Sequence, residues 1–130
     1  MFDHLEIRPA ERGARWPLAR LLVNAEDVIA ESVGPEGRSR SLSALFPLTR
    51  PSPLRAGRRP RRVNLGEPDC TGGCCGYLSA VVQRIGDVVL WSDWELPVDA
   101  TRPLEYTFEA ARYEAELDRA EADPWWRESG

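Results

Sequence analysis

Three cysteines lie within six residues of one another, at Cys70, Cys74 and Cys75. Thiolates are ligands of zinc and nucleophiles in redox chemistry, so this cluster is a candidate metal or thiol site. Its spacing, C-x3-C-C, differs from the C-x2-C pairs of most zinc sites, and a fourth ligand would have to be His4 or a nearby carboxylate. The alternative is structural, with buried thiols in a glycine-rich turn at the start of a strand.

Two tryptophans and two carboxylates form a second group, at Trp91, Asp93, Trp94 and Glu95. In a regular strand, Asp93 and Glu95 share one face at a separation of about 7 Å. Two carboxylates at such a separation can catalyse hydrolysis. The simpler interpretation is that both are solvated charges at the end of a strand. Strict alternation places Trp91 and Trp94 on opposite faces, so that one fills the core and the other marks a contact surface. These four residues are our candidate binding surface.

Arginine dominates residues 49–62, where prolines and a glycine also interrupt any regular structure. This composition predicts an exposed, irregular loop. Arginines can contact phosphates, but the loop lacks the interleaved aromatic residues that stack on bases. The chain also carries a net charge of −4, and residues 87–130 hold 12 acidic residues against 4 arginines. We therefore expect a solvated loop, or one that bridges to the protein's own acidic helix, and we do not expect a nucleic-acid partner.

The elements around these groups predict an α+β fold. Apolar and polar residues alternate over residues 77–85 and again over 88–94, and Gly86-Asp87 between them is typical of a hairpin turn. Both faces of this hairpin carry apolar residues, which indicates a central position in a sheet. A stripe at spacings of three and four predicts a C-terminal helix over residues 109–122, formed by Ala110, Tyr113, Leu117 and Ala120. Further strands are expected at residues 2–8, 21–23, 63–65 and 104–108, a short helix at 41–48, and either a strand or a helical turn at 28–33.

The length of 130 residues fits a single domain, residues 1–130, interrupted by the arginine- and proline-rich loop at about 49–62. We expect a mainly antiparallel sheet of about five to seven strands around the central hairpin, with the C-terminal helix packed on one face.

Several segments together resemble a family of small uncharacterised proteins from high-GC bacteria. The resemblance rests on Gly-Cys-Cys-Gly-Tyr-Leu at residues 73–78, on Gly-Asp-Val-Val-Leu-Trp-Ser-Asp-Trp at 86–94, and on Phe-Glu-Ala-Ala-Arg-Tyr at 108–113. It covers about residues 65–126 and supports the boundaries of the elements. Members often carry a C-x-C pair before the Gly-Cys-Cys-Gly turn, which this sequence lacks, and no reaction is implied.

The function we expect is that of a small cytoplasmic protein-interaction module, regulatory or immunity-like, with another protein as partner. No stretch approaches the 18 apolar residues of a membrane span, no signal peptide is visible, and the odd, clustered cysteines are not a secreted disulfide framework. The first alternative is a thiol- or zinc-dependent protein using Cys70, Cys74 and Cys75, and zinc is the one cofactor considered. The second is a hydrolase using Asp93 and Glu95. Catalysis is the less favoured class, and the oligomeric state stays open.

Overall fold

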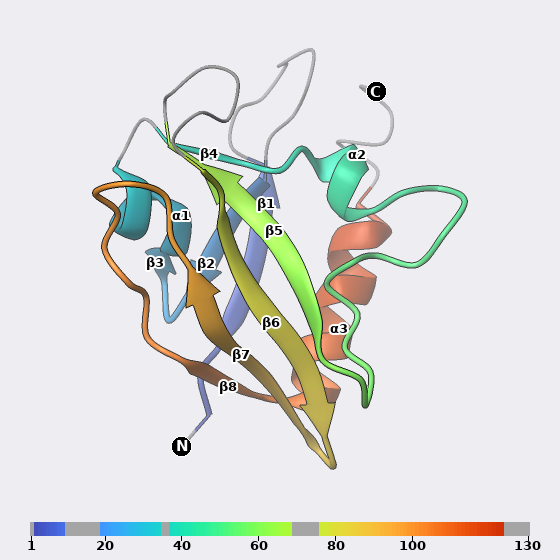
Figure 1. The fold of residues 1–130 in the computed structure, drawn as a ribbon. Coiled ribbons are helices and arrows are strands. Elements are labelled where there is room, and N and C mark those ends of the chain that lie inside the picture. The colour runs from blue at the N-terminus through green and yellow to red at the C-terminus, as the bar shows by residue number, and fades with distance from the viewer. Residues whose placement is uncertain (1, 10–18, 35–36, 69–75, 124–130) are drawn as a thin grey trace.

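A computed structural model describes residues 2–9, 19–34, 37–68 and 76–123 of the chain (Figure 1). These residues form eight strands and three helices, an α+β fold as predicted. In chain order the elements are β1 (Leu5–Pro9), β2 (Ala19–Val23), β3 (Glu26–Asp27), α1 (Val28–Val33), β4 (Arg38–Ser39), α2 (Leu42–Leu45), β5 (Arg61–Glu67), β6 (Leu78–Ile85), β7 (Val88–Glu95), β8 (Tyr106–Glu109) and α3 (Ala110–Glu121).

The larger sheet has five antiparallel strands in the order β4-β5-β6-β7-β8. Its centre is the hairpin of β6 and β7, which confirms the predicted central hairpin. The turn lies at Gly86-Asp87, where Gly86 has a φ of 62°. Glycine adopts this left-handed conformation without strain. Because both strands have neighbours on their outer sides, the hairpin is paired along most of its length.

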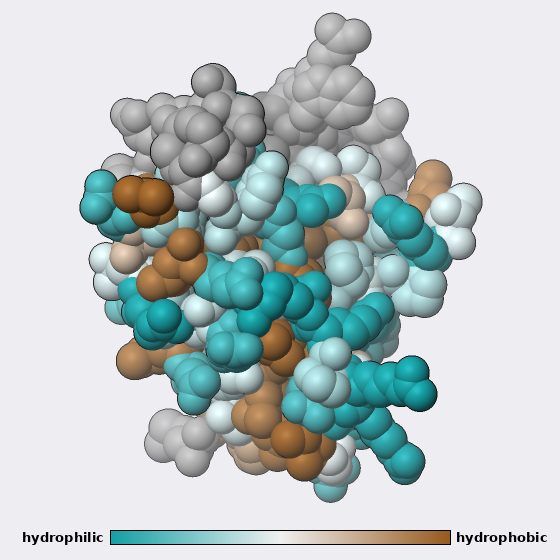
Figure 2. Space-filling view, viewed as in Figure 1, coloured by the Kyte–Doolittle hydropathy of each residue, from teal (hydrophilic) through white to brown (hydrophobic). Residues whose placement is uncertain are grey.

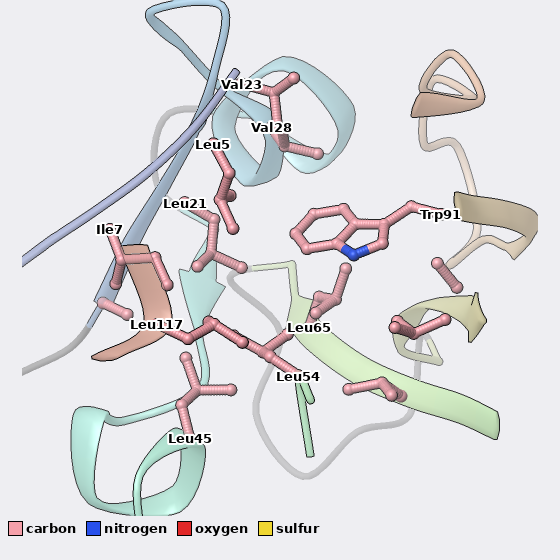
Figure 3. Packing of buried hydrophobic residues seen from close by; sticks show 14 of the residues in the cluster. Leu5, Ile7, Leu21, Val23, Val28, Leu45, Leu54, Leu65, Trp91 and Leu117 are labelled. Carbon is pink, nitrogen blue, oxygen red and sulfur yellow. The ribbon is translucent and has the colours of Figure 1, made fainter. Parts of the chain in front are cut away.

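A smaller sheet of three antiparallel strands, β1-β2-β3, faces the larger one across the core. In Figure 3, Leu5, Ile7 and Leu21 of the smaller sheet lie opposite Trp91 and Leu65 of the larger one. The predicted strands therefore divide between two sheets that enclose one hydrophobic core.

The two sheets also meet through backbone hydrogen bonds at their edges. Asp3 N–H donates to the Thr107 carbonyl of β8 at 2.8 Å, and Ala19 N–H donates to the Arg40 carbonyl beside β4 at 3.3 Å. The smaller sheet is thus joined to both outer strands of the larger one.

Helix α3 packs against this core, as predicted. Its buried residues are Ala110, Tyr113, Leu117 and Ala120, the same four that form the apolar stripe. The Tyr113 hydroxyl donates a hydrogen bond to the Leu54 carbonyl at 2.5 Å and accepts one from Trp91 Nε1 at 3.2 Å. One buried hydroxyl thus connects the helix, the loop before β5 and the central hairpin.

The same helix also contacts the outer edge of β1 through two charged side chains. Glu116 accepts a hydrogen bond from Ile7 N–H at 2.7 Å, and Arg119 donates one to the Ile7 carbonyl at 2.6 Å. Glu116 and Arg119 are themselves paired at 2.7 Å. Both backbone groups of Ile7 are therefore satisfied by side chains.

The short helices begin at capping residues. The carboxylate of Asp27 accepts hydrogen bonds from Ile29 N–H and Ala30 N–H, each at 3.1 Å, so residues 28–33 form a helix and not a strand. Ser41 Oγ caps α2 by accepting from Ala44 N–H at 3.2 Å, which confirms the predicted start of this helix. The helix α2 is shorter than predicted and ends at Leu45. Among the described residues, no helix is both long and apolar enough to cross a membrane.

Residues 46–60 contain no helix or strand, as expected for most of the arginine-rich loop, but they are not all exposed. The predicted loop at 49–62 is too long at its end, because Arg61 and Arg62 belong to β5. Ser52 and Leu54 are buried, which corrects the expectation of an exposed loop at these positions. Arg55 reaches α3 and pairs with Glu114 at 2.5 Å, Asp118 at 2.7 Å and Glu121 at 3.1 Å. The expected alternative, a loop that bridges to the protein's own acidic helix, is confirmed at Arg55.

Candidate functional site

Trp91 and Trp94 lie on the same face of β7, which corrects the prediction of opposite faces. The pairing of β6 with β7 shifts here, because Val81 lies opposite Ser92 whereas Ser79 lies opposite Glu95. This stretch of β7 therefore holds one residue more than β6, which makes a β-bulge. Within the bulge, Asp93 has a φ of 50°. The extra residue reverses the alternation, so both indole rings point into the core.

The two indoles belong to an aromatic cluster in the core. Trp91 is fully buried and Trp94 is 3% exposed. Their ring centroids are 6.4 Å apart in an edge-to-face arrangement. Trp91 meets Tyr106, Phe108 and Tyr113 in the same manner, which is a favoured geometry for aromatic pairs. Neither tryptophan is available as an exposed contact residue.

Asp93 and Glu95 are exposed on the opposite face of the sheet, where both pair with Arg62. The guanidinium lies 2.9 Å from Asp93 Oδ2 and 3.5 Å from Glu95 Oε1, and it also donates to Ser79 Oγ at 3.1 Å. Neither carboxylate lines the hollows beside β4, beside α1 or at the start of α3. Among the described residues, these exposed carboxylates pair with an arginine and line none of these three hollows, so this part of the structure gives the hydrolase hypothesis no support.

The backbone at Asp93 leads to a prediction about the bulge. A β-branched residue in the left-handed region costs about 1–2 kcal/mol, whereas glycine and asparagine adopt it readily. Asp93→Val should therefore lower the free energy of unfolding by about that amount, measured by urea denaturation. Asp93→Asn is the matched control, because it removes the charge and keeps the tolerated backbone. Equal stability of the two variants would show that the left-handed conformation carries no cost.

Trp94 has a different role, as the anchor of the β7–β8 loop, which we define as residues 96–105. Its indole Nε1 donates to the Leu104 carbonyl at 3.0 Å, and its own carbonyl accepts from the Arg102 guanidinium at 2.9 Å. On the side of α1, Thr101 N–H donates to the Ser32 carbonyl at 2.8 Å, and Ser32 Oγ donates to the Thr101 carbonyl at 2.7 Å. The loop is therefore fixed at both the sheet and the helix.

This anchored loop exposes two apolar side chains, Val98 at 71% and Leu104 at 75%. Figure 2 shows hydrophobic side chains on the side of the molecule where Figure 1 draws the loop. Beside Leu104, a hollow of about 180 Å³ lies between the loop, α1 and β8. From sequence, residues 97–103 are expected to connect two strands and Leu104 is expected to begin the second of them; the structure corrects this, because β8 begins at Tyr106 and Leu104 lies in the loop. The signal that could have indicated a surface is the presence of Val98 and Leu104 among prolines and charged residues.

The walls of this hollow combine apolar and acidic groups. Leu104 and Tyr106 contribute apolar surface, Glu26 and Glu31 contribute carboxylates, and Arg102 contributes a guanidinium. Burial raises the pKa of the Tyr106 hydroxyl, and the carboxylates of Asp3, Glu26 and Glu31 raise it further. With the guanidinium of Arg102 also in the lining, the hollow holds two carboxylates against one cation, so its formal charge is negative.

The cysteine cluster lies outside the described residues, so the zinc and thiol hypotheses at Cys70, Cys74 and Cys75 stay predictions. Within the described part of the chain, no group of three or more histidine, cysteine or acidic side chains is placed to hold a metal ion. His4 is exposed, and its backbone N–H donates to Asn24 Oδ1 at 2.9 Å.

Comparison with family models, with curated proteins and with solved structures finds no match to this chain. The resemblance to small proteins of high-GC bacteria thus stays a prediction, and the function has to be inferred from the geometry.

Proposed function

We propose that the protein is a small cytoplasmic protein-interaction module, regulatory or immunity-like, whose contact surface is the β7–β8 loop. One observation carries this proposal. The loop holds Val98 and Leu104 outward while hydrogen bonds from Trp94, Arg102 and Ser32 fix its backbone.

Exposed apolar side chains on a fixed loop favour association with another protein. Burying a leucine side chain contributes about 1.5–3 kcal/mol. Binding normally opposes this gain through the entropy lost when a mobile segment becomes ordered, and a loop already held in place loses less. Leu104 lies beside a hollow, so the loop offers a protruding residue and an adjacent depression together. This shape allows a partner to bury the leucine and to fill the depression in one contact.

Photo-crosslinking tests this proposal. We would replace Leu104 with p-benzoylphenylalanine and irradiate cells that produce the protein. We expect a discrete protein adduct that an excess of the unmodified chain suppresses. The matched control carries the same replacement at Leu48, which is 86% exposed but lies far along the chain in the loop after α2.

The captured protein would then be purified, and its affinity for wild type and for Leu104→Asp would be measured. We expect the variant to bind about tenfold more weakly or worse, because a charge replaces a buried apolar contact. Equal adducts from positions 48 and 104, no adduct at position 104, or unchanged affinity of Leu104→Asp would each contradict the proposal.

A further inference from the structure

The hollow beside Leu104 has the size of a single side chain. Its volume is about 180 Å³, whereas pockets for small molecules and cofactors usually enclose about 300–1,000 Å³. It opens next to the exposed Leu104, on the surface that we propose as the interface. A partner that covers Leu104 would therefore place one of its own side chains at this opening.

The chemistry of the walls selects a positively charged occupant. Glu26, at the start of β3, and Glu31, in α1, both line the hollow. Within the described part of the chain, neither carboxylate has a hydrogen-bond or ion-pair partner. Two unpaired carboxylates beside apolar surface favour a cation with an apolar stem.

The other charged groups nearby are already engaged. Arg102 also lines the hollow, but its guanidinium donates to the Trp94 carbonyl at 2.9 Å. The carboxylate of Asp3, which contributes to the raised pKa of Tyr106, accepts hydrogen bonds from Asn24 Nδ2 and Thr107 N–H, each at 2.9 Å. Arg102 keeps its positive charge, so the hollow holds two carboxylates against one guanidinium, and among the described residues neither Glu26 nor Glu31 is paired with it.

The aromatic ring of Tyr106 favours arginine over lysine as the side chain that occupies the hollow. Its ring is half-buried and forms part of the wall, with its hydroxyl in the field of the carboxylates. A planar guanidinium can stack on an aromatic face and pair with a carboxylate at the same time, which a compact ammonium does less well.

We infer that this hollow, formed by Glu26, Val28, Glu31, Leu104 and Tyr106, binds an arginine side chain of a partner protein. The alkyl stem lies against Leu104, and the guanidinium lies on Tyr106 between the two carboxylates. The inference rests on the proposed function and names the chemistry that the partner must carry.

Peptide titration followed by NMR tests this inference on the whole chain without knowledge of the partner. The probe is acetyl-leucyl-arginyl-alanine amide, and the matched probes carry citrulline, lysine or glutamate in place of arginine. We expect the arginine peptide to shift the amide signals of residues 26–32 and 101–106 and the indole N–H signal of Trp94. The neutral citrulline peptide, which has nearly the same shape, should bind about two- to fivefold more weakly, as expected for the loss of exposed ion pairs.

Two double variants with the same change in charge provide the control. Glu26→Gln with Glu31→Gln should reduce the affinity for the arginine peptide to that of the citrulline peptide. Asp93→Asn with Glu95→Gln, on the outer face of the sheet, should leave it unchanged. Equal binding of the arginine and citrulline peptides, stronger binding of the lysine or glutamate peptide, or equal effects of the two double variants would overturn the inference. Crosslinking at position 104 could still succeed in each of these cases, so the two proposals fail separately.

Discussion

Replacing Trp91 with alanine should lower the free energy of unfolding by about 3–5 kcal/mol, the usual cost of removing a large aromatic side chain from a core. Trp91 is fully buried and meets four other aromatic rings edge-on. Its removal leaves a cavity between the two sheets and an unpaired hydrogen-bond acceptor at Tyr113. Because small domains are stable by only about 5–15 kcal/mol, this loss is a large part of the total.

Urea denaturation monitored by circular dichroism measures this effect. Trp91→Phe should cost less than Trp91→Ala, because a phenyl ring fills part of the space. Leu48→Ala, at an exposed position, should change stability by less than about 0.5 kcal/mol. If Trp91→Ala proves no more costly than Leu48→Ala, the aromatic cluster is not the centre of the core.

The second large effect is expected from Tyr113→Phe, which removes a single oxygen atom. The Tyr113 hydroxyl donates a hydrogen bond to the Leu54 carbonyl at 2.5 Å and accepts one from Trp91 Nε1 at 3.2 Å. Without it, two buried polar groups lose a partner, and each such group costs about 1–3 kcal/mol. We therefore expect a loss of about 2–4 kcal/mol, measured by urea denaturation at pH 7. A loss below about 0.5 kcal/mol would mean that water replaces the hydroxyl at both groups.

The same residue predicts how stability depends on alkaline pH. Burial raises the pKa of the Tyr113 hydroxyl well above its ordinary value. Above the unfolded pKa of about 10, the unfolded chain loses this proton and the folded chain keeps it. The free energy of unfolding should then fall as pH rises, by up to about 1.4 kcal/mol per pH unit. Tyr113→Phe should show a smaller slope, with a remainder from Tyr106, whose pKa is also raised. An unchanged slope would contradict the burial of Tyr113.

Periodicity predicted the elements that are long and regular. The hairpin with its turn at Gly86-Asp87 is present, and so is the C-terminal helix with its buried stripe. A search for capping residues would also have identified residues 28–33 as a helix and not a strand, because Asp27 lies one position before the segment and caps it. Over six residues, hydrophobic spacing alone does not separate a strand from a helical turn.

The candidate site was less predictable, and the reason is the bulge at Asp93. A regular alternation separates Trp91 from Trp94, and one additional residue in β7 brings them together. Glycine in a strand would have suggested an irregular backbone, but aspartate gives no such indication. Asp93 and Glu95 were correctly expected at the surface, although their pairing with Arg62 joins strands that are distant in sequence.

The contact between α3 and β1 has a consequence for how the molecule can associate. Strand edges with free backbone groups recruit strands from other chains, which leads to fibrils or to exchanged segments. At Ile7 those groups are occupied by Glu116 and Arg119, and the charges of this pair would have to be displaced before another strand could be added. This pair therefore protects the β1 edge at Ile7 against the addition of a strand from another chain.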